Sequence, residues 1–228
     1  MLEAKDWKHI FKLDPDKQIS DEDLEAICES GSDAIMIGGT YGVTFDNTIE
    51  LLARVRRYAI PCCLEISNQE AIVPGFDHYF VPIVLNARDS DWILQPHFQA
   101  VKDLGTMIPW HDISTVGYTV LNKEASVAEL TKSETELSEE DIIAYGRLSY
   151  HLLKSSFFYL EYSGTIGDYE KLKVVSQRLK REGELHLFYG GGISSLEQAK
   201  QWLEVADTIV VGNIIYEDIE KAIQTVVK

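Results

Sequence analysis

Two glycine-containing segments near the end of the chain have the composition of phosphate-binding loops. Residues 190–192 are three glycines that follow an apolar run at residues 186–189, and residues 212–213, Gly-Asn, follow a second run at residues 207–211. Glycine has no Cβ, so the backbone N–H groups of such loops can approach an anion closely. A helix that begins after each loop would add the positive end of its dipole. This spacing predicts a phosphate site between two neighbouring strands.

Two charged residues and a hydroxyl near the start of the chain could complete such a site. Lys12 and Asp14 are two positions apart in an extended segment, so their side chains point to one side, and Thr40 follows the next apolar run. A carboxylate and a hydroxyl suit Mg²⁺, which binds substrate phosphates with one or two protein ligands. The alternative is structural, with Asp14 capping the turn at Pro15 and Thr40 capping the next helix. Their common position at strand ends favours the metal site.

Eight apolar runs are expected to position these residues. The runs are continuous rather than alternating, as parallel strands covered on both faces should be. The predicted strands are residues 9–13, 34–37, 61–66, 78–85, 115–121, 157–161, 186–189 and 207–211. A (β/α)8 TIM barrel places the two glycine loops after its seventh and eighth strands, where such barrels commonly hold phosphate. We therefore predict an α/β fold with a single TIM-barrel domain over residues 1–228; a doubly wound open sheet is the alternative.

The segments between the strands mostly have helical spacing. Helices are predicted after Ser20 and Ser138, and at residues 45–58, 96–104, 168–181, 194–204 and 216–227. Residues 68–77 are too few and contain Pro74-Gly75, so a loop is expected in place of the third outer helix. Residues 123–137 are polar and predict a mobile loop, either a solvated connection or an active-site lid.

Composition excludes several classes of protein. The 228 residues are 45% apolar and 25% charged, as in an ordinary globular domain. A formal net charge of −16 argues against nucleic-acid binding and requires local groups or a metal to hold a phosphate. Cys28, Cys62 and Cys63 have neither metal-ligand spacing nor an even count. No cationic leader and no membrane-length apolar run are present, so we expect no integral membrane segment and a cytoplasmic location.

Five short segments at the predicted strand ends together resemble one known family. They are residues 11–15 (FKLDP), 37–40 (IGGT), 159–164 (YLEYSG), 189–193 (YGGGI) and 211–213 (VGN). They resemble the geranylgeranylglyceryl and heptaprenylglyceryl phosphate synthases, particularly the bacterial heptaprenyl branch, over nearly the whole chain. The resemblance implies Mg²⁺-dependent transfer of a long prenyl group from a polyprenyl diphosphate to the C3 hydroxyl of sn-glycerol 1-phosphate. It also implies a homodimer, and a lipid product that brings the protein to the membrane surface.

Carried over by position, the resemblance assigns roles to the residues of these segments. Asp14 and Thr40 are expected to hold the metal and the diphosphate, and Lys12 to neutralise the leaving group. Glu161 is expected to orient the glycerol hydroxyl and take its proton, rather than to be a solvated or ion-paired carboxylate. Glycerol phosphate is expected at Lys12, Tyr159, Leu160, Glu161, Tyr162, Ser163, Gly164, Gly190, Gly191, Gly192, Gly212 and Asn213.

The remaining expectations concern the prenyl tail and the polar residues without a role. Residues 79–104 offer apolar side chains for a groove, which the small Ala100 would leave open for a longer chain. Other polar residues at predicted strand ends receive no role: Glu65, Ser67, Asn86, Asn122 and Tyr189.

Two further functions remain open. A sugar-phosphate isomerase of the same fold would use Asp14 and Glu161 as its acid and base and would need no metal. A non-catalytic protein would bind glycerol phosphate tightly and turn over no prenyl diphosphate. Mg²⁺ dependence separates the first from a synthase, and turnover separates the second.

Overall fold

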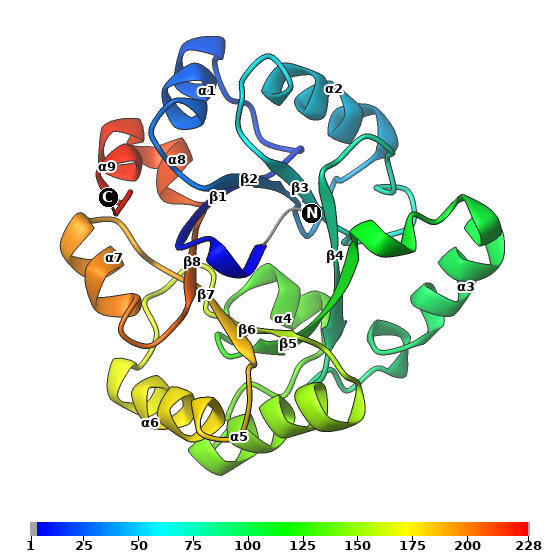
Figure 1. Ribbon diagram of the computed structural model, residues 1–228, viewed down its shortest axis with the longest axis vertical. Helices are drawn as coiled ribbons and strands as arrows, with labels where there is room; N and C mark the ends of the chain where they lie inside the picture. The colour runs from blue at the N-terminus through cyan, green and yellow to red at the C-terminus, as the bar shows by residue number, and fades with distance from the viewer. Residues whose placement is uncertain (1–3, 228) are drawn as a thin grey trace.

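The computed structural model describes residues 4–227, which form a closed barrel of eight parallel strands surrounded by helices (Figure 1). The strands pair in chain order, and β1 pairs with β8 to close the barrel. Their bounds are β1 His9–Leu13, β2 Ala34–Ile37, β3 Cys62–Glu65, β4 His78–Val84, β5 Ile113–Val120, β6 Phe157–Glu161, β7 His186–Gly190 and β8 Thr208–Val211. The predicted barrel is confirmed, and the open-sheet alternative is wrong.

Most of the α-helices begin where the sequence supplies a capping side chain. Ser20, Thr44, Ser138, Asp168 and Ser195 each accept a hydrogen bond from the backbone N–H three residues later. The α-helices are α1 Asp21–Cys28, α2 Phe45–Val55, α3 Gln95–Leu104, α4 Ser126–Thr131, α5 Glu139–Arg147, α6 Tyr169–Lys180, α7 Leu196–Trp202, α8 Ile214–Glu217 and α9 Ile219–Gln224. Helices α3, α4 and α8 begin without a capping side chain. Short 3-10 turns span Ala4–Asp6, Ser90–Trp92, Gly105–Met107 and Trp110–Asp112, and a π turn spans Leu148–Leu152.

Three helical predictions are wrong in detail. Residues 123–137 contain the short helix α4 rather than loop throughout. The predicted helix at residues 216–227 is two helices, because Asp218 is extended and its side chain accepts from Lys221 N to start α9. The helix predicted to reach residue 58 ends at Val55. The described residues 66–77, between β3 and β4, form no helix, as predicted.

Alternate residues of each strand face the barrel interior and the outer helices. The interior cluster includes Ile10, Cys63, Tyr159 and Phe188, while the residues between them pack outward under the helices. The next inward position along each strand therefore lies at the carboxyl rim of the barrel. This period of two brings Lys12, Glu65, Glu161, Gly190 and Gly212 to one rim.

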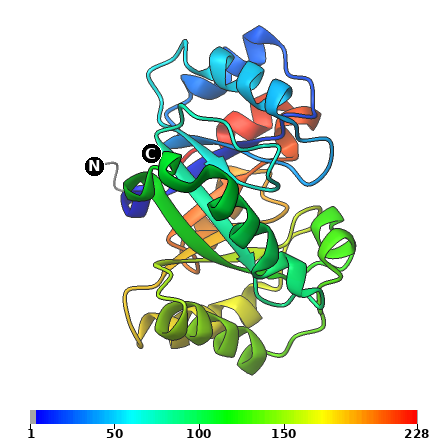
Figure 2. The ribbon, with the colours of Figure 1, turned by 90° about the vertical axis from the view of Figure 1, so that its right-hand side faces the viewer.

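Helix α3 differs from the other long helices in its packing. It lies outermost over β4 and β5 (Figure 2), and none of its residues is buried. Val81 and Ile83 of β4 point outward beneath it and are only half-buried, whereas all four residues of β2 are buried. A space is thus left between α3 and the barrel wall. Within residues 4–227, no helix has the length and apolar character needed to cross a bilayer.

Candidate active site

A cavity of about 1370 Å³ opens at the carboxyl rim of the barrel and continues under α3. Its lining includes most residues of the predicted site: Lys12, Asp14, Thr40, Tyr159, Glu161, Ser163, Gly164, Gly190, Gly191, Gly192, Gly212 and Asn213. The carboxyl ends of parallel strands meet at this rim, so residues from distant segments converge here. The fold therefore brings the segments of the resemblance to one cavity.

Leu160 and Tyr162 do not line this cavity. Leu160 is fully buried among the outward-facing apolar residues, and Tyr162 packs against the same outer cluster and the ring of Tyr189. The period of two along β6 explains this, because Tyr159, Glu161 and Ser163 face inward while the residues between them face outward. Any contact of Leu160 or Tyr162 with a ligand would have to come from their backbone atoms.

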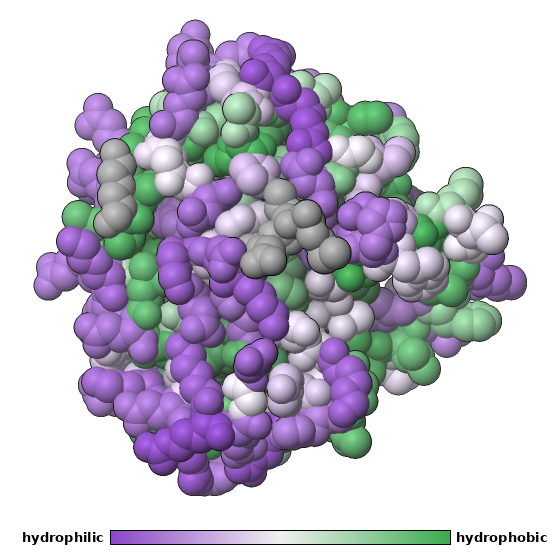
Figure 3. All heavy atoms as spheres, viewed as in Figure 1, coloured by the Kyte–Doolittle hydropathy of each residue, from purple (hydrophilic) through white to green (hydrophobic). Residues whose placement is uncertain are grey.

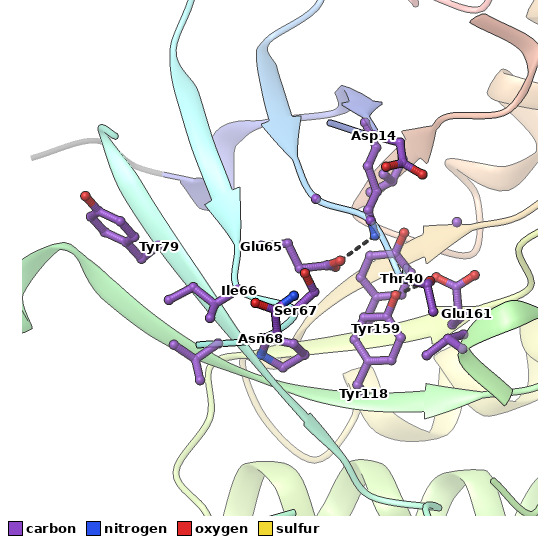
Figure 4. A pocket seen from close by; sticks show the side chains of 18 of the residues that line it. Asp14, Thr40, Glu65, Ile66, Ser67, Asn68, Tyr79, Tyr118, Tyr159 and Glu161 are labelled. Carbon is purple, nitrogen blue, oxygen red and sulfur yellow. Dashed lines mark hydrogen bonds and ion pairs between the residues drawn. The ribbon is translucent and has the colours of Figure 1, made fainter. Parts of the chain in front are cut away.

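Lys12 is paired with Glu65, a residue to which the sequence gave no role. Lys12 Nζ forms an ion pair and hydrogen bond with Glu65 Oε2 (Figure 4), and the side chains are 20% and 9% exposed. Burial lowers the pKa of Lys12, but the carboxylates of Glu65, Glu161 and Asp14 outweigh it, and the pKa is raised overall. Lys12 therefore stays charged and can neutralise an anion at the rim.

Glu161 is held in one orientation by two hydrogen bonds. Its Oε2 accepts from the Tyr118 hydroxyl at 2.6 Å, and its Oε1 accepts from Ser163 N. The Tyr118 ring stacks on Tyr159 with 4.5 Å between centroids, and Figure 4 shows Glu65 and Glu161 on either side of the two rings. Burial raises the pKa of Glu161, against the lowering effects of Lys12 and these hydrogen bonds. A fixed carboxylate with a raised pKa suits a general base.

Tyr118 supports this orientation because its hydroxyl stays protonated. Burial, together with the neighbouring Glu161 carboxylate, raises the pKa of Tyr118 well above its usual range. The phenol therefore keeps its proton and donates to Glu161. Sequence reasoning missed Tyr118, because its position within β5, rather than at the strand end, gave no signal of a polar role.

Asp14 and Thr40 both face the cavity. Asp14 Oδ1 accepts from Asp16 N at 3.1 Å, so Asp14 does cap the turn at Pro15, and its carboxylate lies so close to Gly39 that a Cβ there would be 2.3 Å from Oδ1. Burial raises the pKa of Asp14 against the effects of that N–H and of nearby lysines. Thr44, not Thr40, caps α2, so the structural alternative for Thr40 is wrong.

The charges of this rim suit a divalent cation. Asp14, Glu65 and Glu161 place three carboxylates around Lys12, and Asp14 and Thr40 supply hard oxygens. Within residues 4–227, no group of three or more His, Cys, Asp or Glu side chains is placed to hold a metal. Mg²⁺ does not need one, because it commonly combines one or two carboxylates with water and substrate phosphates. The residues present therefore fit Mg²⁺ bound together with a diphosphate.

Packing requires glycine in the first loop, whereas the glycine of the second loop leaves open space in the cavity. Gly192 has φ +61°, and a Cβ there would be 2.5 Å from Ile166 N; a Cβ at Gly190 would be 2.1 Å from the Tyr159 hydroxyl. Packing alone requires these glycines. A Cβ at Gly212 would meet nothing nearer than 3.6 Å, so its open space is left for a ligand.

The helices after the two loops are shorter than expected. Helix α7 has seven residues and α8 has four, so their dipoles add little to anion binding. The open backbone around Gly212 is the stronger feature.

The segment predicted as a possible lid lies over the cavity. Ala125, Val127 and Leu130, in and beside α4, line it. Asn86 ties this segment to the end of β4, because its side-chain Nδ2 donates to Glu134 O at 2.8 Å and its backbone carbonyl oxygen accepts from Glu134 N at 2.9 Å. A role as a lid stays a prediction.

The cavity extends from the polar rim into an apolar groove outside the barrel. The groove runs between residues 68–77 and α3, with walls that include Val81, Ile83, Trp92, Ile93, Ala100, Leu104 and Ile113. Phe80 and Phe98 do not line it, because Phe80 faces the barrel interior and Phe98 faces solvent.

Comparison with known proteins supports the family resemblance of the five sequence segments. A heptaprenylglyceryl phosphate synthase from Bacillus cereus is 54% identical over 226 residues, covering 99% of this chain and 97% of the relative. One from a Geobacillus species is 53% identical, covering 99% and 98%. The structure of (S)-3-O-geranylgeranylglyceryl phosphate synthase from Thermoplasma acidophilum, in complex with sn-glycerol-1-phosphate, superposes with a TM-score of 0.80 at 22% identity, over 96% of this chain and 94% of that one. The PcrB family model matches residues 2–228, so this chain belongs to the PcrB family.

Proposed function

We propose that the protein transfers a long prenyl group from a polyprenyl diphosphate to the C3 hydroxyl of sn-glycerol 1-phosphate. The names of its relatives indicate that this group is heptaprenyl. One observation carries this function: the polar rim and the apolar groove form one continuous cavity. A substrate with an anionic head and a long apolar tail needs both parts. A sugar-phosphate isomerase would need only the rim, so the groove favours the prenyltransferase.

The residues of the rim account for the reaction. The C3 hydroxyl oxygen forms a bond to C1 of the prenyl group as the bond from C1 to the diphosphate oxygen breaks. Glu161, oriented by Tyr118 and Ser163 N, takes the hydroxyl proton. Lys12 stabilises the negative charge that grows on the leaving diphosphate. Asp14 and Thr40 would hold Mg²⁺, which neutralises diphosphate charge when bound.

The direct test supplies the substrates. The protein is incubated with Mg²⁺, radiolabelled sn-glycerol 1-phosphate and C20, C30 or C35 prenyl diphosphate, and lipids are extracted. We expect a labelled ether lipid, with C35 the preferred donor, and none after chelation of the metal. No product with any donor, despite tight glycerol phosphate binding, would support the non-catalytic alternative.

Asp14→Ala tests the metal site. We expect product formation to be lost while glycerol phosphate binding stays close to that of the original protein. The thermal unfolding midpoint should fall only slightly, because the variant loses one exposed turn hydrogen bond from Asp16 N and no core packing. The Mg²⁺ concentration for half-maximal activity, measured on Asp14→Asn, is expected to rise. Normal turnover by Asp14→Ala would show that the metal lies elsewhere.

We further propose that the protein acts in the cytoplasm as a homodimer, as the resemblance implies. Sedimentation equilibrium measures the mass in solution, and a monomer at working concentrations would contradict the dimer.

A further inference from the structure

Large apolar side chains are exposed along one side of α3 and in the turns after it. Leu94, Phe98, Met107 and Trp110 are 68%, 56%, 72% and 61% exposed, and Val101 is 45% exposed. Leu94, Phe98 and Val101 are four and three positions apart, which places them on one helix face. We call these five residues the α3 patch. Green and pale residues gather over α3 at the right-hand edge of Figure 3. Contiguous exposed apolar residues mark interaction sites.

The α3 patch is continuous with the groove. Leu94, Val101, Met107 and Trp110 also line the cavity that contains the polar rim. The apolar lining of the groove therefore reaches the outer surface at the patch. Phe98 lies outside the lining, and the neighbouring His97 ring contacts Pro82 O at 3.0 Å, which fixes α3 to β4. The patch thus forms the outer edge of the groove, and Phe98 is its one member whose exposed surface faces only solvent.

Charge on α3 is low and balanced. Its ten residues include one lysine, Lys102, and one aspartate, Asp103, whose carboxylate accepts from Gln99. The whole chain carries a formal net charge of −16. Attraction to anionic lipid headgroups would require a basic cluster, which the described residues of α3 do not supply. Insertion of apolar side chains does not require one.

We propose that the α3 patch inserts into the interfacial layer of a lipid bilayer, so that the prenyl tail enters the groove directly from the membrane. This inference rests on the proposed function, because a long prenyl tail partitions into lipid. Trp110 and Met107, beside the opening of the groove, lie at headgroup depth, where the amphipathic ring of tryptophan is favoured. The lipid surface thereby covers the exposed apolar face.

Vesicle binding without substrate tests the surface alone. The protein is mixed with phosphatidylcholine vesicles that carry brominated acyl chains, and flotation and tryptophan fluorescence are measured. Trp7 and Trp202 are buried. Trp92 is half-buried in the groove, so quenching is measured in a Trp92→Phe background, where Trp110 is expected to account for most of it. Trp110→Phe should lose most of the quenching and still float. High salt, or replacement of half the lipid by phosphatidylglycerol, should not strengthen binding; a strong gain with anionic lipid would overturn insertion by apolar contact.

Phe98→Ser is the decisive variant, because Phe98 faces outward and lines no part of the cavity. We expect the bound fraction to fall so that the vesicle partition coefficient drops by about tenfold or more. Leu152→Ser is the matched control, because Leu152 is 74% exposed on the turn after α5. It should bind as the original protein does. Equal binding by both variants would overturn the proposal.

Assays of activity and of self-association distinguish a failure of the lipid-binding proposal from a failure of the proposed function. Phe98→Ser should turn over a short, water-soluble prenyl diphosphate at the original rate and slow only with a vesicle-borne donor. Vesicle binding without any turnover would contradict the proposed function but support lipid binding by the α3 patch. If the original protein fails to float, and Phe98→Ser changes a dimer to a monomer, the patch is a contact between two copies and the proposal is overturned.

Discussion

Glu161 shows how neighbours prepare one residue for chemistry. Its carboxylate is 1% exposed, yet both oxygens already accept hydrogen bonds, from Tyr118 and from Ser163 N. The position of Glu161 at a strand end was predictable from the sequence. Its partner Tyr118 was not, because the two residues are 43 positions apart and meet only when β5 pairs with β6. The pairing of Lys12 with Glu65 is hidden for the same reason.

Glu161→Gln is expected to slow product formation by about 100-fold or more, because glutamine cannot accept the hydroxyl proton. The amide has nearly the same shape, so the KM for glycerol phosphate should change little. Steady-state kinetics with both substrates measures the two effects. An unchanged kcat would show that another group takes the proton.

Two glycine variants separate ligand binding from packing. Gly212→Ala places a methyl group in open space, so we expect about tenfold weaker glycerol phosphate binding at an unchanged unfolding midpoint. Gly192→Ala is the contrasting change, because φ +61° and the contact with Ile166 N should destabilise the fold. Calorimetry measures both binding and unfolding. Normal binding by Gly212→Ala would exclude close contact of the phosphate with this residue.

At the scale of elements, the strands were the predictable part of the fold. Their apolar runs are continuous, which indicates parallel strands covered on both faces. Each run stops at a polar or glycine residue, which marks the end of the strand. Helix α4 was not predictable, because it has six residues, lacks a side-chain cap and lies in a polar segment held by Asn86. The break at Asp218 was missed because apolar spacing continues through it. Leu160 and Tyr162 entered the predicted site as part of a continuous segment, whereas a strand presents alternate residues.

The position of helix α3 beside the groove leads to a prediction about the length of the prenyl donor. Ala100 lines the groove from the inner side of α3, so Ala100→Trp should obstruct it partway along. We expect the preferred donor to change from a C35 to a shorter prenyl diphosphate, with little change for the C20 donor. Product chain length, read by mass spectrometry from an equimolar donor mixture, measures this. An unchanged preference for C35 would place the tail elsewhere.

For the whole molecule, two buried histidines at the amino end of the barrel couple folding to pH. Burial lowers the pKa of His9 and of His186 to about 4. Their rings contact hydroxyls of Ser32 and Thr225, and of Thr208, at 2.7–2.9 Å. Above pH 6.5 both are neutral, folded or unfolded. Between pH 6.5 and about 4 the unfolded chain binds protons that the folded chain does not, so stability falls as pH falls.

We expect each of these histidines to lower the free energy of unfolding by about 2 kcal/mol between pH 7 and pH 5. His186→Gln keeps a hydrogen-bonding side chain and cannot titrate, so its loss over this range should be smaller by that amount. Urea unfolding at the two pH values measures the difference. His111→Gln, at an exposed position, is the control. Equal pH dependence in both variants would contradict a neutral, buried His186.

The half-covered outer side of β4 affects how quickly the protein is degraded in the cell. Val81 and Ile83 lack the close helical cover that other strands have, and a bound prenyl tail would lie against them. The substrate then completes the hydrophobic layer that the polypeptide leaves unfinished. A ligand that binds only the folded chain stabilises it in proportion to the logarithm of its concentration. Cells short of prenyl diphosphate should therefore degrade this protein faster than cells with an ample supply.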